Sequence, residues 1–343
     1  MKTVYFLIQG QFGNNLFQYF AAEIIKKIYG YNEVKPTFQI NLEFNTTMDD
    51  DKFKRVITAY MNGHKYELDT SKDILMMGFF QRSEIFLHER DYIRSLFNEI
   101  NMNNISNRIK IGNIVKYQTK HTVEPQENDL VLHVRLAGAF HWADFIDIEN
   151  KTSQLYNPCD LKNIIKDISY DKLYIVCSEP KADWEKEYLS EFNDLNPTFI
   201  SGLLGDDFNF LLKAKKLITS ASTMSWMAAL LGNAETHIPY NTFYGGYESN
   251  GQSLAICSDS SKIYNITYWF PKNYETIQTK KACKSFIIFE GQELNCFIFS
   301  VPVIKYIHFF EFSLSFRINL QIFVSGILSH DSNSEISFEG NLL

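Results

Sequence analysis

Two stretches of the chain alternate short apolar runs with helix-like segments, and this alternation limits the fold more than any other feature. Residues 3–8 form an apolar, β-branched and aromatic run that ends near Gly10. From Asn15 apolar residues recur at helical spacing as far as Ile28, and Gly30 follows them. A buried strand, a glycine loop and a helix in this order are typical of the opening unit of an α/β fold.

A second series of the same kind occupies residues 130–231. The pattern predicts strands at 130–134, 172–177 and 217–219, with helices at 160–168, 181–192, 208–216 and 225–231. Before it, the pattern predicts a strand at 75–80 and a helix at 84–100. Strands that alternate with helices indicate parallel sheets with both faces covered. The predicted class is therefore α/β, with two Rossmann-like units.

A polar stretch around residues 124–129 separates the two series and gives a domain boundary. We predict an N-terminal α/β domain over residues 1–127, a second α/β domain over 128–277, and a β-rich extension over 278–343. The extension is predicted because residues 310–322 alternate apolar and polar side chains, the period of a half-buried strand. Charged residues interrupt the apolar C-terminal stretch, which argues against a transmembrane helix.

Charge and cysteine usage exclude several classes of protein. The formal net charge of −7 is opposite in sign to that of a protein that binds nucleic acid by neutralising phosphates. The five cysteines are scattered, without metal-ligand spacing, which indicates a reducing compartment and free thiols. Because residues 4–8 are too short an apolar run for a signal peptide, we predict a cytoplasmic protein. Contact of the apolar tail with the inner face of the membrane stays open.

The glycine loop after the first predicted strand is the first candidate binding site. Gly13 and Asn14 stand where the loop becomes a helix. Glycine lets the backbone approach a ligand, and the first amides of a helix point toward negative groups. A tight strand-to-helix turn without a ligand explains the same residues, so both interpretations stay open.

The second candidate site is the end of the strand predicted at 130–134. In an alternating strand His133 and Arg135 lie on one face. An arginine at the carboxyl edge of a parallel sheet stands where open α/β folds bind ligands, and its fork of donors matches a diphosphate. An interdomain salt bridge with a core histidine is the alternative interpretation.

The third candidate site follows the strand predicted at 217–219. Ser222, Thr223 and Ser225 lie between that strand and the next helix, and Asp207 precedes them at the start of the preceding helix. Hydroxyls at a helix N-terminus can bind phosphate oxygens, and the helix dipole adds attraction. Simple N-capping would need only one of these hydroxyls.

Together these motifs resemble the α-1,2-fucosyltransferases of glycosyltransferase family 11. The family's opening motif is similar to Gly-x-Gly-Asn-Gln-(Leu/Met)-Phe-Gln-Tyr, and residues 12–19 read FGNNLFQY. Its late motif is similar to Ser-Asn-Ser-Thr-Phe-Ser-Trp-Trp-Ala-Ala-x-Leu, and residues 220–231 read SASTMSWMAALL. Residues 176–180 (VCSEP) with Trp184 resemble a third family segment, and Asp207 also has a family counterpart. The resemblance extends from residue 4 to about residue 275.

The resemblance implies a GT-B-like scaffold and inverting, metal-independent transfer of L-fucose from GDP-fucose to a glycan hydroxyl, with an α-1,2 linkage to a terminal galactose. It makes residues 1–127 the acceptor-side domain and residues 128–277 the nucleotide-sugar-binding domain. It assigns Arg135 and Asn14 to catalysis, and it assigns donor binding to His133, Gly13, Asp207, Ser222, Thr223 and Ser225. GDP-fucose is then the donor substrate, and no cofactor, metal or nucleic acid is expected. The family's His-x-Arg-Arg-Gly-Asp pattern differs from residues 133–138, which read HVRLAG and lack the second arginine and the acid. A different donor or linkage, or an inactive glycan-binding or nucleotide-sugar-binding protein, therefore stays open.

Overall fold

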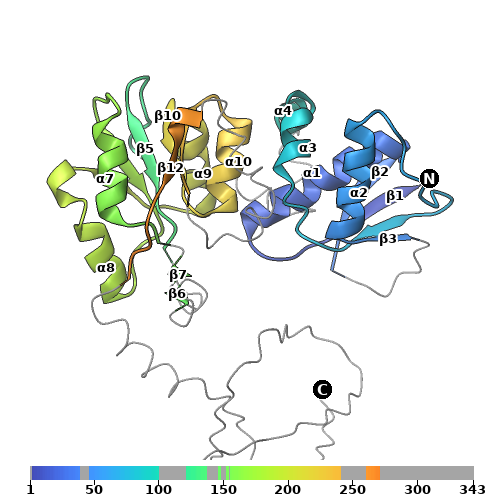
Figure 1. The fold of residues 1–343 in the computed structure, drawn as a ribbon, viewed down its shortest axis with the longest axis horizontal. Helices are drawn as coiled ribbons and strands as arrows, with labels where there is room; N and C mark the ends of the chain where they lie inside the picture. The colour runs from blue at the N-terminus through green and yellow to red at the C-terminus, as the bar shows by residue number, and fades with distance from the viewer. Residues whose placement is uncertain are drawn as a thin grey trace, which may run out of the picture. The chain divides into compact units, whose positions relative to one another are not determined.

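The computed structural model describes residues 2–38, 46–99, 121–136, 146–147, 152–153, 155–240 and 260–270. Two parallel sheets organise these residues (Figure 1). The predicted α/β class with two Rossmann-like units is confirmed. The β-rich extension predicted over residues 278–343 lies outside the described residues.

The first sheet consists of four parallel strands in the order β2-β1-β4-β3. These strands are β1 (Thr3–Leu7), β2 (Glu33–Thr37), β3 (Thr46–Met48) and β4 (Ile74–Met76). Its helices are α1 (Phe12–Tyr29), α2 (Asp50–Met61), α3 (Ser83–His88) and α4 (Arg90–Glu99). Gly30 ends α1 because its φ of 71° is a left-handed conformation that glycine adopts freely, and its N–H bonds to the Lys26 carbonyl.

The second sheet consists of six parallel strands in the order β12-β11-β10-β5-β8-β9. They are β5 (Leu130–His133), β8 (Leu173–Val176), β9 (Thr198–Ile200), β10 (Lys216–Ile218), β11 (Glu235–Tyr240) and β12 (Ile263–Asn265). Counted along the chain from β5, this is the strand order of a Rossmann fold. A short antiparallel pair, β6 (Ile146–Asp147) and β7 (Thr152–Ser153), forms a third sheet.

Helices connect and flank the strands of the second sheet (Figure 1). They are α7 (Pro158–Lys166), α8 (Asp183–Ser190), α9 (Leu204–Lys213) and α10 (Thr223–Leu231). Asn157 caps α7 by accepting a hydrogen bond from the Cys159 N–H, and Pro158 occupies the first helical position, where no N–H is needed.

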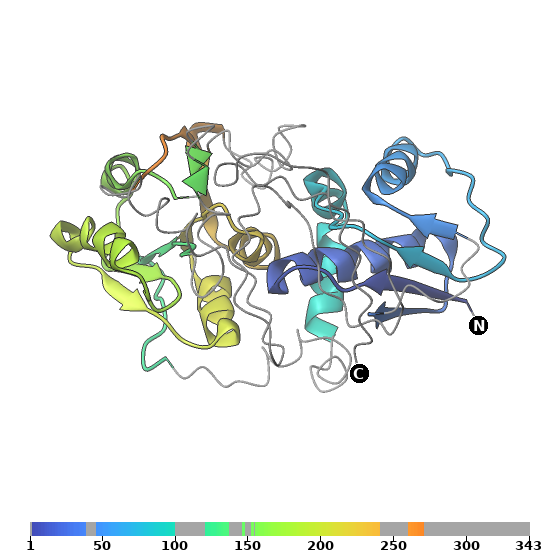
Figure 2. The same ribbon diagram turned by 90° about the horizontal axis from the view of Figure 1, so that it is seen from below.

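Helices α1 and α10 pack against each other, as Figure 2 shows. The Phe17 ring of α1 lies 5.0 Å from the Trp226 ring of α10, and Phe12 meets Phe208 of α9 edge to face at 4.9 Å. These side chains are buried in one hydrophobic core that contains residues of both sheets. Aromatic pairs of this kind each contribute about 0.5–1.5 kcal/mol beyond their burial, so the core holds α1 and α10 together.

Two arginines of α4 cap the carboxyl end of α10. The side chains of Arg90 and Arg94 both donate to the Leu230 carbonyl, at 2.9 and 3.0 Å, and Arg94 also bonds to the Gly232 carbonyl. The last carbonyls of a helix lack partners within the helix and carry partial negative charge. The arginines supply both hydrogen bonds and positive charge to these carbonyls, and they hold the C-terminus of α10 in place.

The structure corrects two of the predicted helices. The helix predicted at 84–100 is divided into α3 and α4 at Glu89, whose buried carboxylate accepts hydrogen bonds from Lys27 and Tyr60. The helix predicted at 208–216 starts earlier, at Leu204, and Asp207 therefore lies inside its first turn. The predicted domain limits stay predictions.

Residues 1–272 form one compact unit, separate from residues 273–343. We expect a chain that ends at residue 278 to unfold cooperatively, with its melting temperature within about 2–4 °C of the full chain, which corresponds to about 1 kcal/mol. Thermal unfolding followed by circular dichroism measures this. A truncated chain that is insoluble or unfolded would show that the C-terminal residues belong to the core.

None of the helices in the described part of the chain is long and apolar enough to span a membrane.

Candidate functional site

The strand order of the second sheet reverses between β5 and β10. From β5 the chain builds outward through β8 and β9 on one side, and then returns to add β10, β11 and β12 on the other. Open α/β sheets bind ligands beyond the carboxyl ends of the strands at such a switch point. The second and third candidate motifs follow these two strands, so the topology brings them to one place.

Side-chain contacts join the two motifs directly. The Nδ1 atom of His133, the last residue of β5, hydrogen-bonds with the Ser220 hydroxyl at 2.7 Å. The Arg135 guanidinium donates to the Ala221 carbonyl at 3.3 Å. The guanidinium of Arg135 and the loop leading into α10 therefore lie side by side at the switch point.

The hydroxyls of the loop before α10 have separate tasks. Ser222 caps α10 by accepting from the Met224 N–H at 3.3 Å, the task that the simpler interpretation gave to one hydroxyl. Ser225 is fully buried, and its hydroxyl donates to the Ser222 carbonyl and accepts from the Ser220 N–H, so it holds the loop. Among the described residues the Thr223 hydroxyl has no hydrogen-bond partner. Thr223 and the first-turn amides of α10 are thus the groups placed to meet an anion.

His133 is uncharged at neutral pH. Burial and, to a smaller extent, the positive charge of Arg135 lower the pKa of its imidazole to about 3. The neutral ring can hold Ser220 without placing a second cation beside Arg135. His133 therefore supports the loop, while Arg135 supplies the fixed positive charge of the site.

The buried imidazole predicts a pH dependence of stability. Below the ordinary pKa of 6.5 the unfolded chain binds a proton at His133 that the folded chain does not. The free energy of unfolding should therefore fall by about 1.4 kcal/mol per pH unit as the pH drops from 6.5 toward 3. Urea unfolding of the wild type and of His133→Gln between pH 6.5 and 5 measures this, and we expect the variant to lack that part of the slope.

Equal slopes in the two proteins would contradict the assignment of a neutral, buried His133. Asp207 acts in the opposite direction, because burial raises the pKa of its carboxyl to about 6 and the folded state then holds the extra proton as the pH falls. Since Asp207 is present in both proteins, the comparison removes its contribution.

Asp207 lies in the first turn of α9 and pairs with a histidine that the sequence analysis did not single out. Its Oδ1 atom lies 3.1 Å from Nε2 of His121, and both side chains are largely buried. The neighbouring Asp206 is fully buried, and neither of its carboxylate oxygens has a hydrogen-bond partner among the described residues. Nothing in the spacing around His121 pointed to this pair, because 86 residues separate the partners.

Gly13 is the point where α1 meets α10. A Cβ atom at Gly13 would lie 2.3 Å from Oγ1 of Thr223 and 2.6 Å from the Met224 backbone nitrogen. Only glycine permits this approach. Gly13, which was predicted to bind the donor, therefore packs against the N-terminus of α10. The first and third candidate motifs are therefore adjacent. Asn14, the next residue, hydrogen-bonds through Oδ1 with the Gln81 amide at 2.9 Å.

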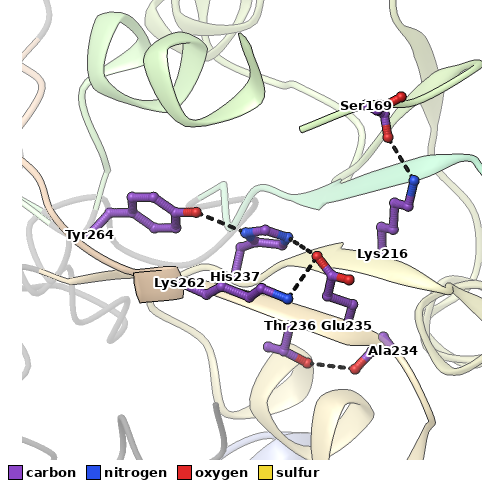
Figure 3. Close-up of polar contacts among 8 residues, drawn as sticks. All are labelled: Ser169, Lys216, Ala234, Glu235, Thr236, His237, Lys262 and Tyr264. Carbon is purple, nitrogen blue, oxygen red and sulfur yellow. Dashed lines mark hydrogen bonds and ion pairs between the residues drawn. The ribbon is translucent and has the colours of Figure 1, made fainter. Parts of the chain in front are cut away.

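A second polar cluster lies around β11, near the amino ends of β10 and β11 (Figure 3). His237 contacts the Tyr264 hydroxyl at 3.0 Å and Glu235 at 3.1 Å, and Lys262 pairs with Glu235 at 3.0 Å. Burial lowers the pKa of His237. Both ring nitrogens are engaged in hydrogen bonds, so we assign His237 a structural role.

Comparisons with known proteins give distant likenesses. No family model and no curated protein sequence matches the chain. A mutant of FUT1 from Arabidopsis thaliana in complex with GDP has a TM-score of 0.38 and 10% identity, over 70% of this chain and 71% of that one. NodZ α-1,6-fucosyltransferase soaked with GDP-fucose has a TM-score of 0.40 and 13% identity, over 67% of this chain and 92% of that one. At these TM-scores neither likeness defines the fold or the activity of this chain.

The described residues contain no group of three or more His, Cys, Asp or Glu side chains placed to hold a metal ion. The described cysteines, Cys159 and Cys177, are both free thiols.

Proposed function

We propose that this chain transfers L-fucose from GDP-fucose to a glycan hydroxyl, forming an α-1,2 linkage to a terminal galactose with inversion and without a metal ion. The observation that carries the proposal is the contact of Arg135 with the loop that leads into α10, at the switch point of a Rossmann-like sheet. The family 11 resemblance of the same segments supplies the donor and the linkage.

The chemistry needs negative charge to be stabilised on the leaving diphosphate. As the bond between fucose and the β-phosphate breaks, charge develops on the phosphate oxygens while the sugar becomes cationic. Arg135 offers a positive charge and a fork of donors, and Thr223 and the first amides of α10, which follow the loop that Arg135 contacts, offer further donors. Donors already held in place by the fold lower the barrier without reorganisation at the moment of reaction.

A buried carboxylate in the first turn of α9, the helix that follows β9 of the same sheet, fits a guanine base. Guanine presents N–H donors on its edge, and a carboxylate accepts them. Asp207 is the carboxylate that we assign to this task, with His121 orienting it through Oδ1. At neutral pH its carboxyl, whose pKa burial raises to about 6, is mainly ionised and can accept.

The test is an incubation of the purified chain with GDP-fucose, galactose-terminated acceptors and EDTA. We expect GDP release that depends on the acceptor, and an α-1,2 linkage in the product by NMR. Release from a different sugar nucleotide would favour another donor, which the missing second arginine after Arg135 makes the main alternative. Binding of GDP without turnover of any donor would contradict the enzyme assignment and favour an inactive binding protein.

A further inference from the structure

The first sheet has a carboxyl edge of its own, which the donor site does not use. In its order, β2-β1-β4-β3, the parallel strands β1 and β4 are neighbours, so the segments that follow them leave the sheet at the same edge. The loop after β4, residues 77–82, and the start of α1 meet at this edge. The features of this loop point to a ligand with both apolar faces and hydroxyls.

The loop after β4 is held rigidly in an uncommon backbone conformation. Phe80 has a φ of 54°, which is rare for a bulky residue, and its fully buried ring packs 5.1 Å from Phe53. The Asp50 carboxylate accepts both the Phe80 and the Phe79 N–H, at 2.6 and 3.2 Å. Strained backbone that is fixed by its surroundings tends to occur at functional sites.

This conformation leaves the neighbouring aromatic ring exposed. Phe79 is 39% exposed, although the loop on which it lies is anchored on both sides. Its ring lies over Gly10, where a Cβ atom would come within 3.0 Å of Cε1 of Phe79 and 2.3 Å of the Asn14 amide nitrogen. Gly10 also has a φ of 70°, a conformation that glycine adopts freely. Both the close contacts and the backbone conformation therefore require glycine at this position.

An amide pair stands beside the ring. The Gln81 amide nitrogen donates to Oδ1 of Asn14 at 2.9 Å, which orients both side chains. Within the described residues, the Asn14 amide nitrogen and the Gln81 carbonyl oxygen make no other hydrogen bond. Amide N–H donors and a carbonyl acceptor thus remain next to an exposed aromatic ring. An apolar surface with a few oriented polar groups is the usual composition of a small-molecule site.

We propose that this edge of the first sheet is the acceptor subsite, in which the Phe79 ring stacks on the apolar face of a pyranose while the Asn14 and Gln81 amides bind its hydroxyls. That the bound sugar is the acceptor rests on the proposed function. That a sugar binds here rests on the geometry of the loop alone. Asn14 follows Gly13, which abuts Thr223 at the donor site, so the two ligand-binding edges are adjacent along α1.

The experiment titrates methyl β-D-galactopyranoside, with glucose and N-acetylglucosamine glycosides alongside, into the full chain and follows binding by saturation-transfer NMR. We expect Phe79→Ala to weaken galactoside binding at least about tenfold, and Phe79→Tyr, which keeps the ring, to retain it. Gln81→Ala should weaken binding as well. Phe199→Ala is the matched control, because Phe199 is 41% exposed on the edge strand β9 of the other sheet.

GDP binding to the same variants separates this proposal from the proposed function. If the wild type and Phe79→Ala bind GDP equally and only Phe79→Ala loses the galactoside, both proposals are supported. Unchanged galactoside binding by Phe79→Ala, or no binding of any of the pyranosides by the wild type, overturns the subsite. A wild type that binds the galactoside through Phe79 but does not bind GDP overturns the donor assignment and leaves the sugar site intact.

Discussion

Replacing Arg135 by alanine is expected to slow fucose transfer by about 10²–10³-fold, or about 3–4 kcal/mol in the barrier. The guanidinium lies beside the loop that leads into α10, where it would meet the charge that develops on the leaving diphosphate. Initial rates of GDP release from GDP-fucose, with a saturating galactoside acceptor and EDTA present, measure the effect.

Two further variants isolate the cause. Arg135→Lys keeps the charge but loses the fork of donors, so we expect an intermediate rate. Arg55→Ala removes an exposed arginine of α2 and should match the wild type. Equal rates for Arg135→Ala and the wild type would mean that the diphosphate is held elsewhere.

Replacing Gly13 by alanine is expected to lower the free energy of unfolding by about 1–3 kcal/mol and to weaken GDP binding at least tenfold. In a helix this change usually stabilises, because alanine has the higher helix propensity. Here the new methyl group would meet Thr223 and the Met224 backbone nitrogen and displace the first turn of α10. Urea unfolding and GDP titration measure the two effects.

Controls for this variant lie in the same helix and across the contact. Gly30 lies at the other end of α1, with a φ of 71° and no atom within 4 Å of where a Cβ would stand. Gly30→Ala should therefore strain the backbone and lower stability without changing GDP affinity. Adding Thr223→Ala to Gly13→Ala should not restore stability, because the Met224 nitrogen and the Thr223 carbonyl carbon also clash. A Gly13→Ala protein that is as stable as the wild type would contradict the close approach of α1 and α10.

The sequence predicted the strands that have continuous apolar runs and missed the others. The central strands β1, β5 and β8 are buried and almost wholly apolar, so pattern alone located them. Strand β2 (EVKPT) carries Glu33, Lys35 and Pro36, which are tolerated because it is at the edge of its sheet. The three-residue strands β3, β9 and β12 are too short to show a period.

The candidate site was predictable where strand ends define it. His133 ends one strand and Arg135 follows it, and the Ser220–Thr223 segment follows another strand, so the carboxyl-edge rule places them at one edge of the sheet. The same rule could not separate a hydroxyl that holds the loop, as in Ser225, from one without a hydrogen-bond partner among the described residues, as in Thr223, because that depends on packing. The Asp207–His121 pair and the Phe79 loop depend on contacts between distant segments, which leave no local signal.

A crystal structure of the chain with GDP would locate the diphosphate. We expect it within hydrogen-bond distance of the Arg135 guanidinium and of the first amides of α10, at the carboxyl ends of β5 and β10. Nucleotide bound at any other edge of either sheet, with Arg135 turned away from it, would rule out Arg135 and α10 as the diphosphate site.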